Sequence, residues 1–221
     1  MTIAFVQSKS AGSSGDVSTL TASFDSAPTN GNLLVATLSY RSGGARTYPS
    51  GWAEAVQIGS SINVSASIAW KIAGASESSD VAISAVGTAG GMTICIAEFS
   101  GIATSTPVDQ SDTSNVDSTV TTIAIGPTGT LSQADELAIA VVGVRLEAPG
   151  SSIAFTDSFT TQEFADAVSG TRHVTGGLGY KIVSATTALS NDPTWTNARM
   201  VSGCMVTFKG GFAFSQAVII G

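Results

Sequence analysis

Charged residues are scarce in this 221-residue chain, in which Asp, Glu, Lys and Arg together make up 11% of the sequence, against roughly 25% in an average soluble protein. The balance is acidic, with 9 basic and 16 acidic residues. Binding to the phosphates of nucleic acid requires a basic face, and no cluster of Lys and Arg provides one. The composition therefore excludes free nucleic acid as a partner.

Residues suited to catalysis and metal binding are equally few. The one histidine, His173, has no Gly-x-Ser-x-Gly motif to accompany it, so a serine hydrolase lacks support. Glu98 and Asp166 could be nominated as the carboxylates of a glycosidase, but nothing in the sequence pairs them. No zinc spacing and no phosphate-binding glycine loop occurs. We predict that the protein is not an enzyme and needs no metal or cofactor.

Long hydrophobic runs are also missing. The longest, Leu137 to Val142, has the length of a strand, whereas a membrane helix needs roughly 20 apolar residues. The N-terminus lacks the basic and apolar regions of a secretory signal, so we expect synthesis in the host cytoplasm without a signal peptide and no membrane partner. The only two cysteines, Cys95 and Cys204, make no disulfide framework and are expected to be buried thiols.

The most informative feature present is internal repetition. Residues 70–72 (WKI) and 180–182 (YKI) are 110 residues apart, and each is followed by a Cys-x-x-x-Phe-x-Gly segment, with Cys95 and Cys204 separated by 109. A further pair of blocks at an offset of 104 is formed by residues 32–36 (NLLVA) and 136–140 (ELAIA). Three matched blocks in one order predict an internal duplication of a β unit.

Strand signals recur every 8–15 residues, with Gly, Pro and Asn turns between them. Residues 33–38 and 137–142 are apolar on both faces, which predicts central strands covered on both sides. We predict an all-β, antiparallel, jelly-roll-like β-sandwich over residues 1–210, built from halves 1–103 and 119–210. Two tandem small sandwiches are the alternative, and one short helical turn is expected near residues 163–168.

Two segments fall outside the matched blocks. Residues 104–118 are polar and contain a proline, so we predict a linker there, with Asp109, Asp112 and Asp117 in a solvated loop rather than a calcium site. Residues 211–221 are strongly apolar and would not remain free in water. We expect this arm either to add an edge strand to its own sheet or to cross to a neighbouring subunit, through the apolar residues Phe212, Phe214, Val218, Ile219 and Ile220.

One segment, residues 40–52, combines three aromatic residues and two arginines in a long predicted turn: Tyr40, Arg41, Arg46, Tyr48 and Trp52. Tyr, Trp and Arg are the residues that most often anchor protein interfaces, and aromatic faces beside polar groups bind sugars. The segment is therefore a candidate interface or glycan contact. The competing interpretation is structural, with Trp52 closing the end of the sandwich and the arginines solvated.

The motifs GNLLVA (31–36), PSGW (49–52), WKIAGA (70–75) and AEFSG (97–101) resemble a broad group of bacterial and phage β-sandwich modules. Those modules carry similar GDLLVA, PSGW, YYKVAG and YEFSG motifs and a second, weaker half. The resemblance covers about Phe5 to Gly210, and no Pro-x-Gly-Trp follows the second central strand. Because these are turn, plug and core-strand residues, they specify a fold better than a task.

In phage genomes such modules resemble virion components, either capsid decoration (cement) proteins or tail-associated proteins. The resemblance therefore implies a structural protein on the capsid exterior, bound to the major capsid protein as a symmetric homo-oligomer, a trimer or a dimer. Residues 1–10 and 211–221 would be its arms. A tail-associated or carbohydrate-binding module is the alternative expectation.

Overall fold

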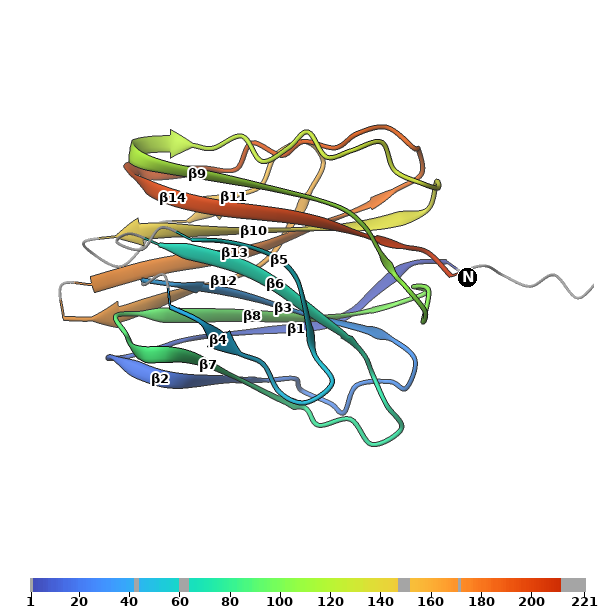
Figure 1. Ribbon diagram of the computed structural model, residues 1–221, viewed down its shortest axis with the longest axis horizontal. Coiled ribbons are helices and arrows are strands. Elements are labelled where there is room, and N and C mark those ends of the chain that lie inside the picture. The colour runs from blue at the N-terminus through green and yellow to red at the C-terminus, as the bar shows by residue number, and fades with distance from the viewer. Residues whose placement is uncertain (1, 42–43, 60–63, 147–151, 171, 212–221) are drawn as a thin grey trace, which may run out of the picture.

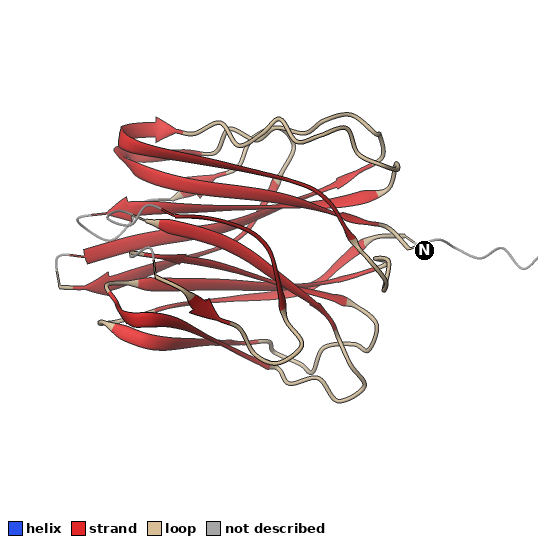
Figure 2. Ribbon diagram, in the orientation of Figure 1, coloured by secondary structure: helices blue, strands red, loops and turns tan. Residues whose placement is uncertain are grey.

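The computed structural model describes residues 2–41, 44–59, 64–146, 152–170 and 172–211, and every regular element in these ranges is a strand (Figure 1, Figure 2). The strands are β1 (Ala4–Gly12), β2 (Val17–Ser23), β3 (Leu33–Tyr40), β4 (Arg46–Thr47), β5 (Ala53–Gly59), β6 (Ser65–Ile72), β7 (Asp80–Ala89), β8 (Met92–Ser100), β9 (Val108–Thr122), β10 (Glu136–Leu146), β11 (Ile153–Ala154), β12 (Thr160–Ser169), β13 (Arg172–Val183) and β14 (Thr194–Lys209).

Two large antiparallel sheets face each other. The first has the order β1-β8-β3-β6-β5, and the second has the order β9-β14-β10-β13-β12, with β11 also paired to β14. A third sheet, β2-β7-β4, lies on the first sheet at the opposite side of the molecule from β9 and β14 (Figure 1). The prediction of an all-β antiparallel sandwich is confirmed.

The matched sequence blocks occupy equivalent positions in the two sheets. Leu33 of β3 pairs with Phe99 and with Ile72 on its two sides. At the same places, Leu137 of β10 pairs with Phe208 and with Ile182. The two halves therefore share not only sequence motifs but also the order and the register of their central strands.

Three apolar clusters separate the layers. The central one lies between the two large sheets and contains residues from both halves, including Leu33, Phe99, Leu137 and Phe208. The second lies between the first sheet and β2-β7-β4, and the third lies on the outer face of the second sheet, under loops and β11. All eight residues of β3 are buried, as are residues 136–144 of β10, which confirms that both strands are covered on two faces.

The edges of the two large sheets are closed against each other. The hydroxyls of Ser8 and Ser10 in β1 donate to the Glu163 carboxylate of β12, at 2.6 and 2.9 Å, and Val168 N donates to Ser13 O at 2.8 Å. On the other side of the sandwich, β5 packs beside β9. Each exposed sheet edge thus has another strand beside it, one of the ways in which natural sheets avoid edge-to-edge association.

Three sequence-based expectations are wrong. Residues 104–118 are not a linker, because β9 begins at Val108 and forms the edge of the second sheet beside β14. Residues 163–168 form no helical turn but lie within β12. Residues 2–10 do not form a free arm in this structure, because β1 is the hydrogen-bonded neighbour of β8. In β1 and β9 the backbone pairing with an adjacent strand outweighs their polar composition.

Both cysteines are free and buried, as predicted. Cys95 lies 3.8 Å from the carbonyl of Gly176 across the central core, and Cys204 lies 3.4 Å from the carbonyl of Ala66. Each thiol thus contacts the opposite half. Burial raises the pKa of Cys95 to about 12 and also raises that of Cys204, so neither is a reactive thiolate at neutral pH.

Candidate functional site

The segment 40–52 contains a tightly connected group of polar side chains. Tyr40 ends β3, Arg46 lies in β4, and Tyr48 follows β4 before the turn that leads to β5. The guanidinium of Arg46 donates to the Glu54 carboxylate and, at 3.1 Å, to the Tyr40 hydroxyl. The Tyr48 hydroxyl lies 3.1 Å from Glu54 Oε2 and 2.9 Å from the hydroxyl of Ser67.

The turn after this group explains the Pro-Ser-Gly-Trp motif. Trp52 N donates to Pro49 O at 3.2 Å, and Gly51 has a φ of 83°. A turn with positive φ at its third residue favours glycine there. The turn directs Trp52 toward the core between the first sheet and β2-β7-β4, where Tyr48 also packs.

Most of the polar groups in this segment are therefore committed within the protein. Tyr40 is fully buried, and the Arg46 side chain is 9% exposed. Burial raises the pKa of Tyr48, and for Arg46 the lowering effect of burial is outweighed by Glu54 and the two tyrosines, which raise its pKa. Arg41 is half-buried, and its backbone N donates to Gly91 O at 3.1 Å.

Tyr40 is consequently not available to a ligand, which corrects its inclusion among the candidate contact residues. Tyr48 and Trp52 are partly buried against the core, and Glu54 completes the group from β5. The sequence identified the right cluster of residues, and the packing of Trp52 supports the structural interpretation. The expectation that both arginines are solvated is wrong for Arg46, whose side chain is buried between Glu54 and Tyr40. Glu54 lies two residues past the segment, and only its role as the acceptor for Arg46 shows its importance.

We predict that Tyr48→Phe lowers the free energy of unfolding by about 1–2 kcal/mol, because it removes hydroxyl contacts with both Glu54 and Ser67 in a partly buried place. Urea unfolding followed by circular dichroism measures the change. Thr47→Ala, at an exposed position of β4, is the matched control and should shift stability little. Equal stability of Tyr48→Phe and the parent protein would contradict the structural role.

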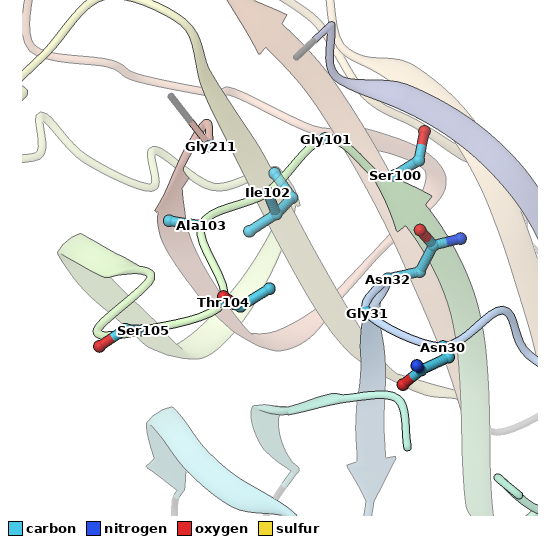
Figure 3. Close-up of a pocket in the computed structure, with 10 residues that line it drawn as sticks. All are labelled: Asn30, Gly31, Asn32, Ser100, Gly101, Ile102, Ala103, Thr104, Ser105 and Gly211. Atoms are coloured by element: carbon cyan, nitrogen blue, oxygen red, sulfur yellow. The ribbon is translucent and has the colours of Figure 1, made fainter. Parts of the chain in front are cut away.

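A groove that the sequence did not indicate lies at the end of the sandwich where β8 and β14 finish. It encloses about 600 Å³ and is lined by Asn30, Gly31, Asn32, Ser100, Gly101, Ile102, Ala103, Thr104, Ser105 and Gly211. Figure 3 shows Asn30 and Asn32 on one wall and Ile102 and Thr104 on the other. Its lining contains three glycines and no charged side chain.

One wall of this groove is fixed by a buried carboxylate. Glu98 of β8 is fully buried and accepts three hydrogen bonds: from Asn32 Nδ2 at 2.6 Å, from Thr29 N at 2.8 Å and from Gln7 Nε2 at 2.6 Å. Asp166, the other carboxylate considered for a glycosidase, instead accepts from Thr175 Oγ1. Because Glu98 is fully buried and bonded to three protein donors, its carboxylate does not face a cleft as a glycosidase residue must.

The remaining polar candidates have structural surroundings. On β9, Asp109 accepts from Ser132 N and Asp112 accepts from Gly126 N, both at 2.8 Å, so neither lies in a solvated loop. Within the described ranges, no group of three or more His, Cys, Asp or Glu residues could hold a metal ion. His173 is a buried residue of β13.

The arm residues Phe212, Phe214, Val218, Ile219 and Ile220 lie outside the described residues. No helix in the described part of the chain is long and apolar enough to cross a membrane. Comparisons with protein-family models, with curated proteins and with solved structures found no match to this chain.

Proposed function

We propose that this protein is a non-enzymatic structural component of a phage virion, a decoration protein that binds the major capsid protein on the capsid exterior as a homo-oligomer. The observation that carries the proposal is a β body closed at both seams, with an apolar segment following Gly211 at one end. The sequence resemblance to phage β-sandwich modules supports the same role.

A closed body suits this task because a protein displayed in many copies must not pair with its neighbours through sheet edges. The hydrogen-bonded seam between β1 and β12 and the packing of β5 beside β9 both serve that end. We also infer that the two halves derive from one duplicated unit, since their central strands share order and register. Duplication gives a large shared core without long helices or many charges.

The apolar end is the proposed contact with other subunits. Seven of the ten residues in 212–221 are Phe, Ala, Val or Ile, and such a segment is stabilised by burial against a partner. We expect deletion of residues 211–221 to lower the oligomer to a monomer or to reduce binding to purified capsids at least about tenfold. Light scattering after size exclusion and co-sedimentation with capsids measure these two effects.

A matched control keeps the length of the arm and changes only its chemistry, with serine in place of Phe212, Phe214, Val218, Ile219 and Ile220. This variant should behave like the deletion. Unchanged oligomer mass and capsid occupancy in both variants would contradict a role for the arm.

Location on the particle is tested by immunogold electron microscopy of particles from the source culture, with antibody raised to this chain. Label over capsid heads is the expected result. Label confined to tails would replace decoration by the tail-associated alternative, and particles without label would overturn the virion proposal.

A further inference from the structure

The two ends of the described chain meet at the same point of β8. Gly211 N donates to Gly101 O at 2.8 Å, directly after β8 ends. On the same glycine, an added Cβ would lie 2.3 Å from the carbonyl oxygen of Thr2, just before β1 begins. Figure 1 shows the end of β14 beside the N-terminus. The segment that follows Gly211 therefore starts next to the edge of β8 that β1 covers.

The sequence of this segment matches β1. Residues 3–12 read IAFVQSKSAG, and residues 212–221 read FAFSQAVIIG. Without a gap, four positions are identical, and they are the pairs Ala4 and Ala213, Phe5 and Phe214, Gln7 and Gln216, and Gly12 and Gly221. Residues 212–221 thus do not lie outside the repeat but continue it.

Three of the four shared residues are those that β1 needs in its place. The ring of Phe5 stacks on Tyr180 at 5.9 Å and meets Phe99 edge-on at 5.8 Å. Gln7 supplies one of the three hydrogen bonds to the buried carboxylate of Glu98. An added Cβ on Gly12 would lie 2.0 Å from the backbone oxygen of Asp166 in β12, so this position excludes larger residues.

The internal symmetry of the two halves also indicates β8 as the strand with which residues 212–221 would pair. β9 follows β8 in the chain and crosses to pair with β14, with Val108 opposite Phe208. β1 holds the corresponding place in the first sheet, with Phe5 opposite Phe99. A strand that follows β14 and crosses in the same way would pair with β8, and the Gly211–Gly101 hydrogen bond is already placed to begin that pairing.

We propose that residues 212–221 are a second copy of the edge strand and can take the place of β1 beside β8 of the same subunit, which releases residues 1–12. In the register of the sequence match, Phe214 would face Phe99 and Gln216 would reach Glu98. If pairing continues without interruption from Gly211 and Gly101, Ala213 rather than Phe214 lies opposite Phe99. A bulge of one extra residue before Phe214, like the bulge of β1 between Phe5 and Gln7, would bring Phe214 opposite Phe99. This inference does not depend on the virion proposal.

β1 occupies the edge position beside β8 because it makes contacts that residues 212–221 cannot make. The Ser8 and Ser10 hydroxyls both bond the Glu163 carboxylate, and the corresponding residues Ala217 and Ile219 cannot. In the exchanged form, residues 212–221 pair with β8 and residues 1–12 are free. A partner that binds free residues 1–12 would shift the equilibrium toward this form by as much as its affinity for the two forms differs. The subunit would then offer an arm without losing the edge of its sheet.

Cysteine cross-linking in the full-length chain tests the exchange. Ala4 pairs with Ser100 in β1, so Ser100→Cys with Ala4→Cys reports β1, and Ser100→Cys with Ala213→Cys reports the second copy; paired strand positions lie within disulfide reach. Under mild oxidation the second pair should form little disulfide while β1 is intact. Adding Phe5→Ala and Gln7→Ala weakens the hold of β1 on the sheet. These substitutions should raise the cross-linked fraction of the Ser100→Cys, Ala213→Cys pair by about tenfold or more.

The matched control adds Phe214→Ala and Gln216→Ala to that weakened variant, and the cross-linked fraction should return to its starting level. Protection of the buried Cys95 and Cys204 from alkylation reports whether the sheet is intact. The proposal is overturned if the weakened variant gains no cross-link, if the disulfide forms only between two subunits, or if Cys95 and Cys204 lose protection, because the second copy would then have failed to hold the edge.

Discussion

Replacing Phe99 with alanine is expected to lower the free energy of unfolding by about 3–5 kcal/mol, the usual cost of removing a fully buried aromatic ring. Phe99 is 0% exposed and lies in the central core, where its ring contacts Phe5 and, at 5.2 Å, Tyr180 of the opposite sheet. No neighbouring side chain can fill the space without leaving its own contacts. Urea unfolding followed by circular dichroism measures the loss.

Phe208→Ala should have an effect of similar size, because Phe208 holds the equivalent register position in β14 and packs edge-on with Trp70 of the first half at 6.3 Å. Ile182→Ala is the control, since Ile182 is 46% exposed and should change stability by less than about 0.5 kcal/mol. Because the core is built by both halves, each variant should still unfold in one transition. Two separate transitions would contradict the shared core and favour tandem units.

The strands that could be predicted are those whose consecutive apolar residues indicate burial on both faces. Residues 33–36 and 137–142 are apolar at consecutive positions, so the coverage of β3 and β10 on both faces followed directly from the sequence. β9 could not be predicted in this way, because its side chains are polar and only partly buried along its length. Its place is determined by backbone pairing with β14, a long-range contact that leaves no periodic signal in the chain.

The candidate site shows the same limit. Residue types made segment 40–52 conspicuous, but whether Tyr40 faces solvent depends on the third sheet, which covers β3. The groove beside Gly101 could not be predicted from the sequence, because the glycine, serine and asparagine residues that line it are also the usual residues of turns. The sequence match between β1 and residues 212–221 gains a structural meaning from the position of Thr2 and Gly211, which both lie beside Gly101 at the end of β8.

The second large effect is expected at Glu136, the first residue of β10. Its side chain is fully buried, beside the Thr207 hydroxyl and the Asp109 carboxylate. Burial raises the pKa of Glu136 from 4.5 to about 7; nearby Asp109 adds to the rise, and the Thr207 hydroxyl opposes it. The folded protein therefore binds a proton here more tightly than the unfolded chain does.

Stability should consequently fall as the pH rises through the interval between these two pKa values. Below pH 4.5 the carboxyl is neutral in both states, and above about pH 7 the folded state carries a buried charge. One pKa unit corresponds to about 1.4 kcal/mol, which sets an upper limit of about 3 kcal/mol for the loss between pH 5 and pH 8. Urea unfolding across this range measures the slope.

Glu136→Gln should remove most of this slope and raise stability at pH 8 by about 1–3 kcal/mol, because a neutral amide replaces a buried charge of the same shape. Glu98→Gln is the matched control. Glu98 is equally buried, but all three of its partners are donors, so an amide NH2 would face one of them. That variant should lose about 1–3 kcal/mol at both pH values. A parent protein as stable at pH 8 as at pH 5, with Glu136→Gln unchanged, would show that Glu136 is ionised in the fold at little cost.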